Sequence, residues 1–139
     1  DTSFILSSHL LFGFATGLYL KSFLSCRGVS DADLRSPKLG HNLAALLRRA
    51  KEMSFASESA ETLVDILGKG HSDFRYRYAG RDVTFPVIGP NNAFEGFRHI
   101  DSFVDESVGA RASLALPPEQ DQGRWELPGL LGYWRIPAA

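Results

Sequence analysis

The opening segment of the chain, residues 3 to about 26, restricts the possible folds more than any other part of the sequence. Large apolar residues recur along it at roughly helical spacing. Its uninterrupted apolar run, residues 10–20, is about half of the ~20 residues that a bilayer crossing requires. We therefore expect a long buried helix of a soluble domain and no membrane segment. The residues of its apolar surface are Phe4, Leu10, Leu11, Phe14, Leu18 and Phe23 or Leu24.

Three small residues lie inside this predicted helix, namely Gly13, Ala15 and Gly17. Glycine within a helix costs about 1 kcal/mol relative to alanine. The two glycines therefore indicate that another helix approaches closely, either from the same chain or from a second copy. Arg27 and Gly28 then place a cation and a flexible residue at the carbonyl end, which is typical of a helix C-terminus.

Periodic apolar residues predict further helices, separated by residues that cap or break them. We expect a short turn over 32–35, a second helix from His41 or Asn42, a third from Ser57 or Ser59 to Gly68-Lys69-Gly70, and a fourth from an Asn92 cap to about Ala112. Between the third and fourth helices the period changes. Residues 74–78 and 83–87 alternate in polarity, which predicts a β-hairpin at about 74–88 with Pro86 at an edge position.

The predicted fold class is thus mainly α, an up-down bundle of four to five helices over residues 1–112 with the small hairpin. Residues 113–139 contain four of the seven prolines together with Trp125 and Trp134. Disordered segments seldom contain so many large apolar groups. We predict an extended arm that packs on the bundle or on a partner subunit. Because the first residue is Asp1 rather than Met, we also expect residues ahead of it.

The composition excludes several classes of protein. The 139 residues include 15 basic and 16 acidic side chains, a balance that argues against a strongly basic nucleic-acid binder. Cys26 is the single cysteine, so no intramolecular disulfide forms. A reducing cytoplasm fits this composition, with Cys26 as a buried thiol. The four histidines lack metal-ligand spacing, and no dinucleotide or phosphate-loop motif occurs. We expect no metal and no cofactor.

Two segments offer candidate functional side chains. Arg35, Lys38 and His41 surround the start of the second helix, where free backbone amides favour anions. His41 either carries a proton or contacts phosphate, or it only fixes the junction between loop and helix. Arg35 and His41 are also the candidates for a catalytic pair, although Pro37 and Gly40 lie between them.

The predicted hairpin and the last helix contribute further cations. Arg75 and Arg77 share one face of a predicted strand and could grip a phosphate, while the aromatic residues between them could stack on bases. The alternative is that the aromatic residues belong to the core and the arginines are solvated. Arg98 lies among acidic residues of the last helix, where a surface network of ion pairs also explains it.

The sequence resembles the HEPN domains, a family of small helical bundles. The resemblance rests on Lys21 in a leucine-rich first helix (residues 17–29), on Lys-Leu-Gly-His-Asn-Leu at 38–43, and on Phe-Arg-Tyr-Arg-Tyr at 74–78. It covers roughly residues 10–110 and implies a helical bundle, frequent homodimers and binding of nucleotides or RNA. Ribonuclease members carry an arginine and a histidine on a late helix, separated by four to six residues, and Arg98 has no histidine at that distance after it.

Three functions follow as hypotheses. The first is a cytoplasmic, homodimeric HEPN-like binding or accessory module that contacts nucleotide or RNA phosphate. The second is a metal-independent ribonuclease toxin that uses Arg35 and His41, or Arg98 with a histidine from another helix. A neighbouring nucleotidyltransferase-type partner protein would point to such a toxin–antitoxin pair. The third is a structural protein–protein interaction domain. For phosphate binding the candidate residues are Lys38, His41, Arg75, Arg77 and Arg98.

Overall fold

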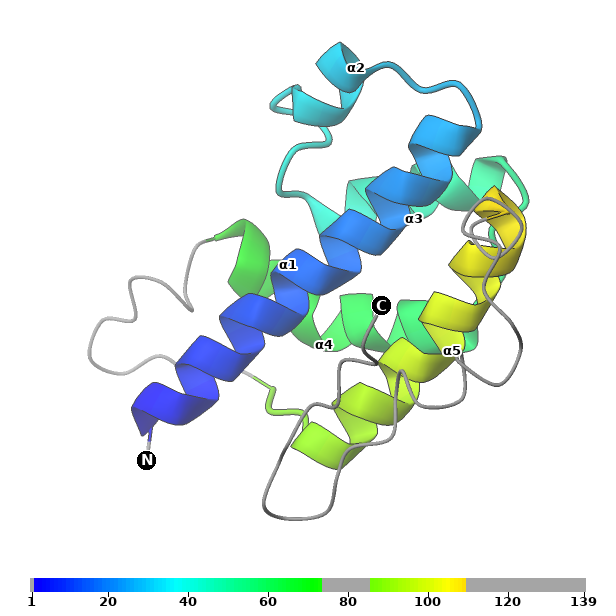
Figure 1. The fold of residues 1–139 in the computed structure, drawn as a ribbon. Helices are drawn as coiled ribbons and strands as arrows, with labels where there is room; N and C mark the ends of the chain where they lie inside the picture. Colours follow the sequence, from blue (N-terminus) through cyan, green and yellow to red (C-terminus); the bar gives the residue numbers. More distant parts are fainter. Residues whose placement is uncertain (1, 74–85, 110–139) are drawn as a thin grey trace, which may run out of the picture. The chain divides into compact units, whose positions relative to one another are not determined.

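A computed structural model describes residues 2–73 and 86–109 of the chain. These residues form a bundle of helices (Figure 1). The predicted mainly-α class is confirmed, and the described residues contain no strand. The chain divides into the units Asp1–Val108 and Gly109–Ala139, of which the first is described below. The helices are α1 (Thr2–Cys26), α2 (Asp31–Arg35), α3 (Leu43–Glu52), α4 (Glu58–Ser72) and α5 (Pro90–Val108).

Most of the predicted hairpin and the whole predicted arm lie outside the described residues. The described end of the second predicted strand, residues 86–88, has no regular secondary structure. Ile88 is nevertheless tied to the bundle, because its backbone N–H donates to His9 Nε2 at 3.0 Å. His9 is buried, and its Nδ1–H donates to the Ile5 carbonyl oxygen at 2.8 Å. A histidine of the first helix thus holds the chain at the point where it leads into α5.

The central helix is α1, which packs against α3, α4 and α5. Leu20, Phe23 and Leu24 are fully buried, so its C-terminal half lies in the core. The segment Phe4–Cys26, with a mean hydropathy of 1.2, is long and apolar enough to cross a membrane. The core helices of soluble proteins and signal sequences meet the same criteria of length and hydropathy. Gly28, two residues after the end of the helix, adopts a φ of +90°, as its predicted C-terminus requires.

The two glycines of α1 mark close helix contacts within the chain, which is one of the two alternatives that the sequence left open. A Cβ atom added to Gly13 would lie against the imidazole of His71 on α4, 2.8 Å from its Cγ atom. A Cβ atom added to Gly17 would lie 3.3 Å from Leu43 Cδ2 at the start of α3. Glycine at these two positions therefore lets α3 and α4 approach the same side of α1.

Helices α3 and α4 bury the faces that their periodicity predicted, and side chains cap both. Asn42 Oδ1 accepts from the backbone N–H of Ala45 at 3.0 Å, and Ser57 Oγ accepts from that of Ala60 at 3.2 Å. Each cap satisfies one of the free amides at a helix start. The residues that the pattern placed inward are all buried, namely Leu43, Leu46, Leu47, Ala50, Ala60, Leu63, Val64 and Leu67.

The expected burial of α1 is only partly met, because Phe4, Leu11 and Leu18 are exposed. Four further local predictions are wrong. Helix α4 does not stop at Gly68-Lys69-Gly70 but continues to Ser72, because both glycines are buried against the bundle and packing outweighs their low helix propensity. Helix α5 begins at Pro90 rather than after an Asn92 cap, since the Ala93 N–H already donates to the Gly89 carbonyl. It ends at Val108 rather than at about Ala112. Gly109, the next residue after Val108, has a φ of +67°, which is typical of a helix C-terminus. Cys26, the last residue of α1, is exposed rather than buried.

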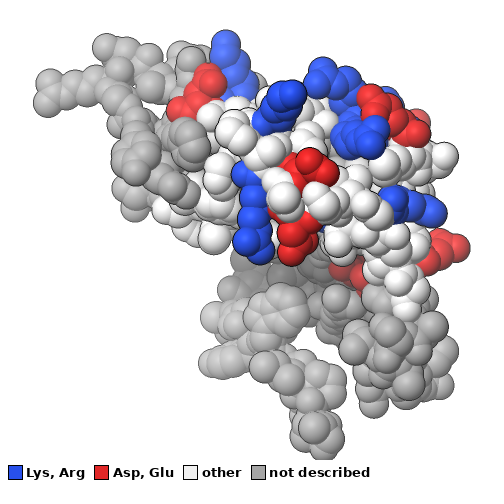
Figure 2. Space-filling model, turned by 90° about the horizontal axis from the view of Figure 1, so that it is seen from above, with Lys and Arg blue, Asp and Glu red and all other residues white. Residues whose placement is uncertain are grey.

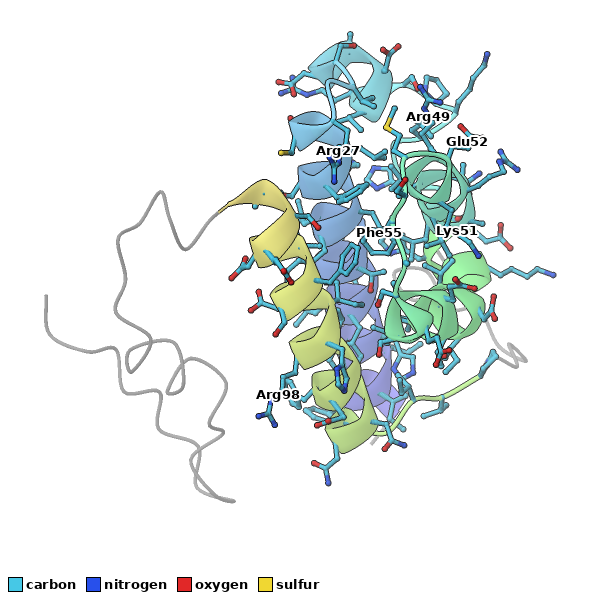
Figure 3. All side chains as sticks on the ribbon, turned by 90° about the vertical axis from the view of Figure 1, so that its right-hand side faces the viewer. Arg27, Arg49, Lys51, Glu52, Phe55 and Arg98 are labelled. Carbon is cyan, nitrogen blue, oxygen red and sulfur yellow. The ribbon has the colours of Figure 1, made fainter. Side chains whose placement is uncertain are left out.

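An aromatic cluster closes the bundle between α1, α5 and the turn after α3. The ring of Phe23 lies edge-on to Phe55 at a centroid distance of 5.0 Å, and Phe55 lies edge-on to Phe103 at 4.9 Å. Figure 3 shows Phe55 pointing inward between the helices. Arg27 covers the outer edge of this cluster, with its guanidinium carbon 5.0 Å from the centroid of Phe23. Edge-to-face packing of this kind stabilises beyond its buried area.

Candidate anion-binding groove

A groove of about 430 Å³ opens at the end of the bundle where α2 lies. The chain after α1, helix α2, the loop 36–42 and the outer side of α3 form its walls. Figure 2 shows this end of the molecule from above, with Lys and Arg side chains gathered on it and Asp and Glu between them. The residues that line the groove are Val29, Asp33, Ser36, Lys38, Leu39, Ala45, Arg48, Arg49 and Glu52.

The loop that carries Lys38 into the groove is held by its own backbone. The carbonyl oxygen of Ser36 accepts from the N–H groups of both Leu39 and Gly40, at 3.2 and 2.8 Å. A Cβ atom on Gly40 would lie 3.0 Å from that same oxygen, so glycine permits the tight turn. The turn leads directly to the Asn42 cap of α3. The predicted breakers of this loop therefore set Lys38 beside the outer face of α3.

The charges around the groove are unequally neutralised. Arg49 Nη1 donates to Glu52 Oε2 at 2.8 Å, so this cation has an acidic partner. Asp33 accepts a hydrogen bond from Ser30 Oγ at 2.7 Å, in addition to lying in the first turn of α2. Lys38 and Arg48 make no ion pair with any residue in the described part of the chain. The groove therefore carries two cations whose charge an anionic ligand could neutralise.

Arg35 and His41, the predicted catalytic pair, have different neighbours and neither lines the groove. Arg35 lies 3.8 Å from Asp31 in an exposed ion pair along α2. The ring of His41 packs edge-on to Phe14 of α1 and to His71 of α4, at centroid distances of 6.2 and 6.0 Å. His41 thus faces the junction of α1, α3 and α4.

In the described part of the chain, no other predicted phosphate-binding residue joins Lys38 in the groove. Arg98 is exposed on α5, and Figure 3 shows it projecting away from the bundle, far from Arg49 on α3. Its neighbour His99 instead places Nε2 3.4 Å from Glu95 Oε1. Arg75 and Arg77 lie outside the described residues. Of the predicted residues that the structure describes, which are Lys38, His41 and Arg98, only Lys38 lines the groove.

Sequence reasoning missed two members of the groove and one cluster. Arg48 and Arg49 fit the pattern of solvent-facing cations on a helix, and nothing in that pattern indicates that α2 lies opposite them. Phe14, His41 and His71 form a second cluster, which brings two histidines from distant parts of the chain together. Among the described residues, no group of three or more His, Cys, Asp or Glu could hold a metal ion.

Comparison of the chain with protein-family models gave no match, and comparisons with curated proteins and with solved structures gave none either.

Proposed function

We propose that the protein is a HEPN-like binding or accessory module whose groove between α2 and α3 holds a phosphate group of a nucleotide or of RNA. The observation that carries this proposal is the presence of Lys38 and Arg48 on one groove, both without an acidic partner among the described residues. The volume of about 430 Å³ falls within the range of small-ligand sites, which span roughly 300–1,000 Å³.

The two cations differ in what they contribute to anion binding. The planar guanidinium of Arg48 can donate two parallel hydrogen bonds to a phosphate, whereas the ammonium of Lys38 acts as a compact charge. Val29, Leu39 and Ala45 give the same groove an apolar wall. Such a wall suits the sugar or base next to the phosphate. Because Asp33 and Glu52 also line the groove, the charge pattern favours one phosphate over a long duplex backbone.

Binding is better supported than cleavage. A ribonuclease that used Arg35 and His41 would need both side chains at one phosphate. Arg35 lies on α2 in an exposed pair with Asp31, whereas the exposed His41 has its ring beside Phe14 and His71. Neither side chain lines the groove. We therefore propose recognition of phosphate without catalysis by this pair.

Replacement of both groove cations tests the proposal. We expect the variant Lys38→Ala/Arg48→Ala to bind a labelled single-stranded oligoribonucleotide or a fluorescent ATP analogue at least tenfold more weakly. Each hydrogen bond to a charged group contributes about 1.5–3 kcal/mol. Fluorescence anisotropy at several salt concentrations gives the affinity and its salt dependence. The slope of log affinity against log salt should become shallower by about 1 for each phosphate contact that is lost.

A matched control removes the same two charges elsewhere. Lys69 and Arg98 are exposed on α4 and α5 and do not line the groove. The variant Lys69→Ala/Arg98→Ala should keep wild-type affinity, because it changes the net charge equally but leaves the groove intact. An equal loss of probe affinity in both double variants would show that the overall charge alone accounts for binding. Failure of the wild-type protein to bind either probe would remove the proposal.

A further inference from the structure

The charged side chains of the groove determine how much negative charge a ligand can bring into it. Three cations, Lys38, Arg48 and Arg49, and two carboxylates, Asp33 and Glu52, line the groove. Glu52 lies 2.8 Å from Arg49, so this pair carries no net charge. Lys38 and Arg48 make no ion pair in the described part of the chain. The groove therefore offers two positive charges to a ligand, and its carboxylates oppose any negative charge beyond that.

Phosphate groups differ in charge according to their place in a nucleotide. A phosphodiester inside an RNA strand carries about one negative charge. A terminal phosphate monoester carries about 1.5–2 at neutral pH, and a terminal triphosphate carries more. We propose, on the basis of the phosphate groove proposed above, that the ligand is the terminal monophosphate of a nucleotide or RNA strand, and that Glu52 excludes a second phosphate.

Glu52 acts on the ligand in two ways. Its carboxylate accepts a hydrogen bond from Arg49 Nη1 at 2.8 Å, so this guanidinium is not available as a third cation. Figure 3 shows the two residues next to each other on the outer side of α3. The same carboxylate lines the groove, where its charge repels a second phosphate. Both side chains are about half exposed, so a phosphate can reach them from solvent.

The uncharged residues of the groove fit the same ligand. Ser36 lines the groove, and its hydroxyl can donate a hydrogen bond to phosphate without adding charge. Val29, Leu39 and Ala45 line it with apolar groups. These groups can cover the sugar or base that follows the terminal phosphate, but they offer no donor to another phosphate.

Three oligoribonucleotides of one sequence test the proposal. Each carries a fluorophore at its 3′ end, and they differ only in a 5′-hydroxyl, a 5′-monophosphate or a 5′-triphosphate. By fluorescence anisotropy, the wild-type protein should bind the monophosphate at least about fivefold more tightly than either of the others. Glu52→Gln keeps the size of the side chain but removes its charge and releases Arg49. This variant should bind the triphosphate at least about fivefold more tightly than the wild type, with less than about a twofold change for the monophosphate.

Glu61→Gln is the matched control. Glu61 also forms an ion pair, 2.9 Å from Lys51, but does not line the groove. The control removes the same charge and should leave the order of the three probes unchanged. An equal gain for the triphosphate in both variants would overturn the role of Glu52. Equal wild-type affinity for the three probes, lost in Lys38→Ala/Arg48→Ala, would overturn the terminal monophosphate but leave phosphate binding intact. Binding of none of the probes would remove the phosphate groove itself.

Competition with adenosine monophosphate identifies the source of the monophosphate. Displacement of the 5′-monophosphate oligoribonucleotide by adenosine monophosphate, but not by adenosine, supports a free nucleotide as the ligand. Displacement only by the unlabelled 5′-monophosphate strand supports an RNA end. Equal displacement by adenosine and adenosine monophosphate would show that the base rather than the phosphate is recognised, and would overturn the proposal.

Discussion

The variant Phe23→Ala should lose about 3–5 kcal/mol of its free energy of unfolding, the cost typical of removing a buried phenylalanine. Phe23 is fully buried and lies at the centre of the aromatic cluster with Phe55 and Phe103. Its removal leaves a cavity and also takes away the ring over which the Arg27 guanidinium lies. Because small domains have only about 5–15 kcal/mol of stability in total, this loss is a large fraction.

Urea denaturation followed by circular dichroism measures the change. The matched control is Phe4→Ala, the same chemical substitution at a side chain that is 64% exposed. At protein concentrations too low for association, we expect this control to lie within about 0.5 kcal/mol of the wild type. Similar losses for the two variants would contradict the position of Phe23 in the core.

The variant Gly13→Ala should be destabilised by about 1–3 kcal/mol, as is typical of overpacking in a core. Alanine is the better helix former, so propensity alone predicts a gain of about 1 kcal/mol. The added methyl group, however, would lie against the imidazole of His71. His71 is buried and packs edge-on to Phe14 at a centroid distance of 5.1 Å, which restricts how far its ring can move.

Gly68→Ala is the control for this prediction. Gly68 also lies inside a helix, but a Cβ atom there meets only Val64 Cγ1 at 3.7 Å, an ordinary contact. We expect this variant to gain up to about 1 kcal/mol. Thermal unfolding of both variants separates the two effects. A gain of stability in Gly13→Ala would contradict the close packing of α1 on α4.

Local patterns in the sequence predicted most of the helices. The inner residues of α3 and α4 recur at helical spacing, and the Asn42 and Ser57 caps have side chains that accept from backbone amides. Such features act within a few residues and can be read directly. The extent of α4 could not be read in this way, because Gly68 and Gly70 are helix breakers by propensity but core residues by packing.

The candidate site was predictable only in part. The sequence predicted Lys38, in the breaker-rich loop before α3, as a phosphate-binding residue, and Lys38 does line the groove. The sequence did not predict Arg48 and Arg49 as site residues, because cations on the outer face of a helix are expected to be solvated. Nearness in sequence pairs His41 with Arg35, whereas in the structure the ring of His41 lies beside Phe14 and His71.

The sequence by itself determined where helices form and which of their faces are apolar, since propensity, capping and periodicity are local properties. The tertiary structure decided which apolar face is covered. On α1, Gly13 and Gly17 turn toward α4 and α3, and Phe4, Leu11 and Leu18 are left outside. A helix that is apolar on every side does not specify its own buried face. The close approach that two glycines permit specifies it, because backbones can pack tightly only where no Cβ atom intervenes.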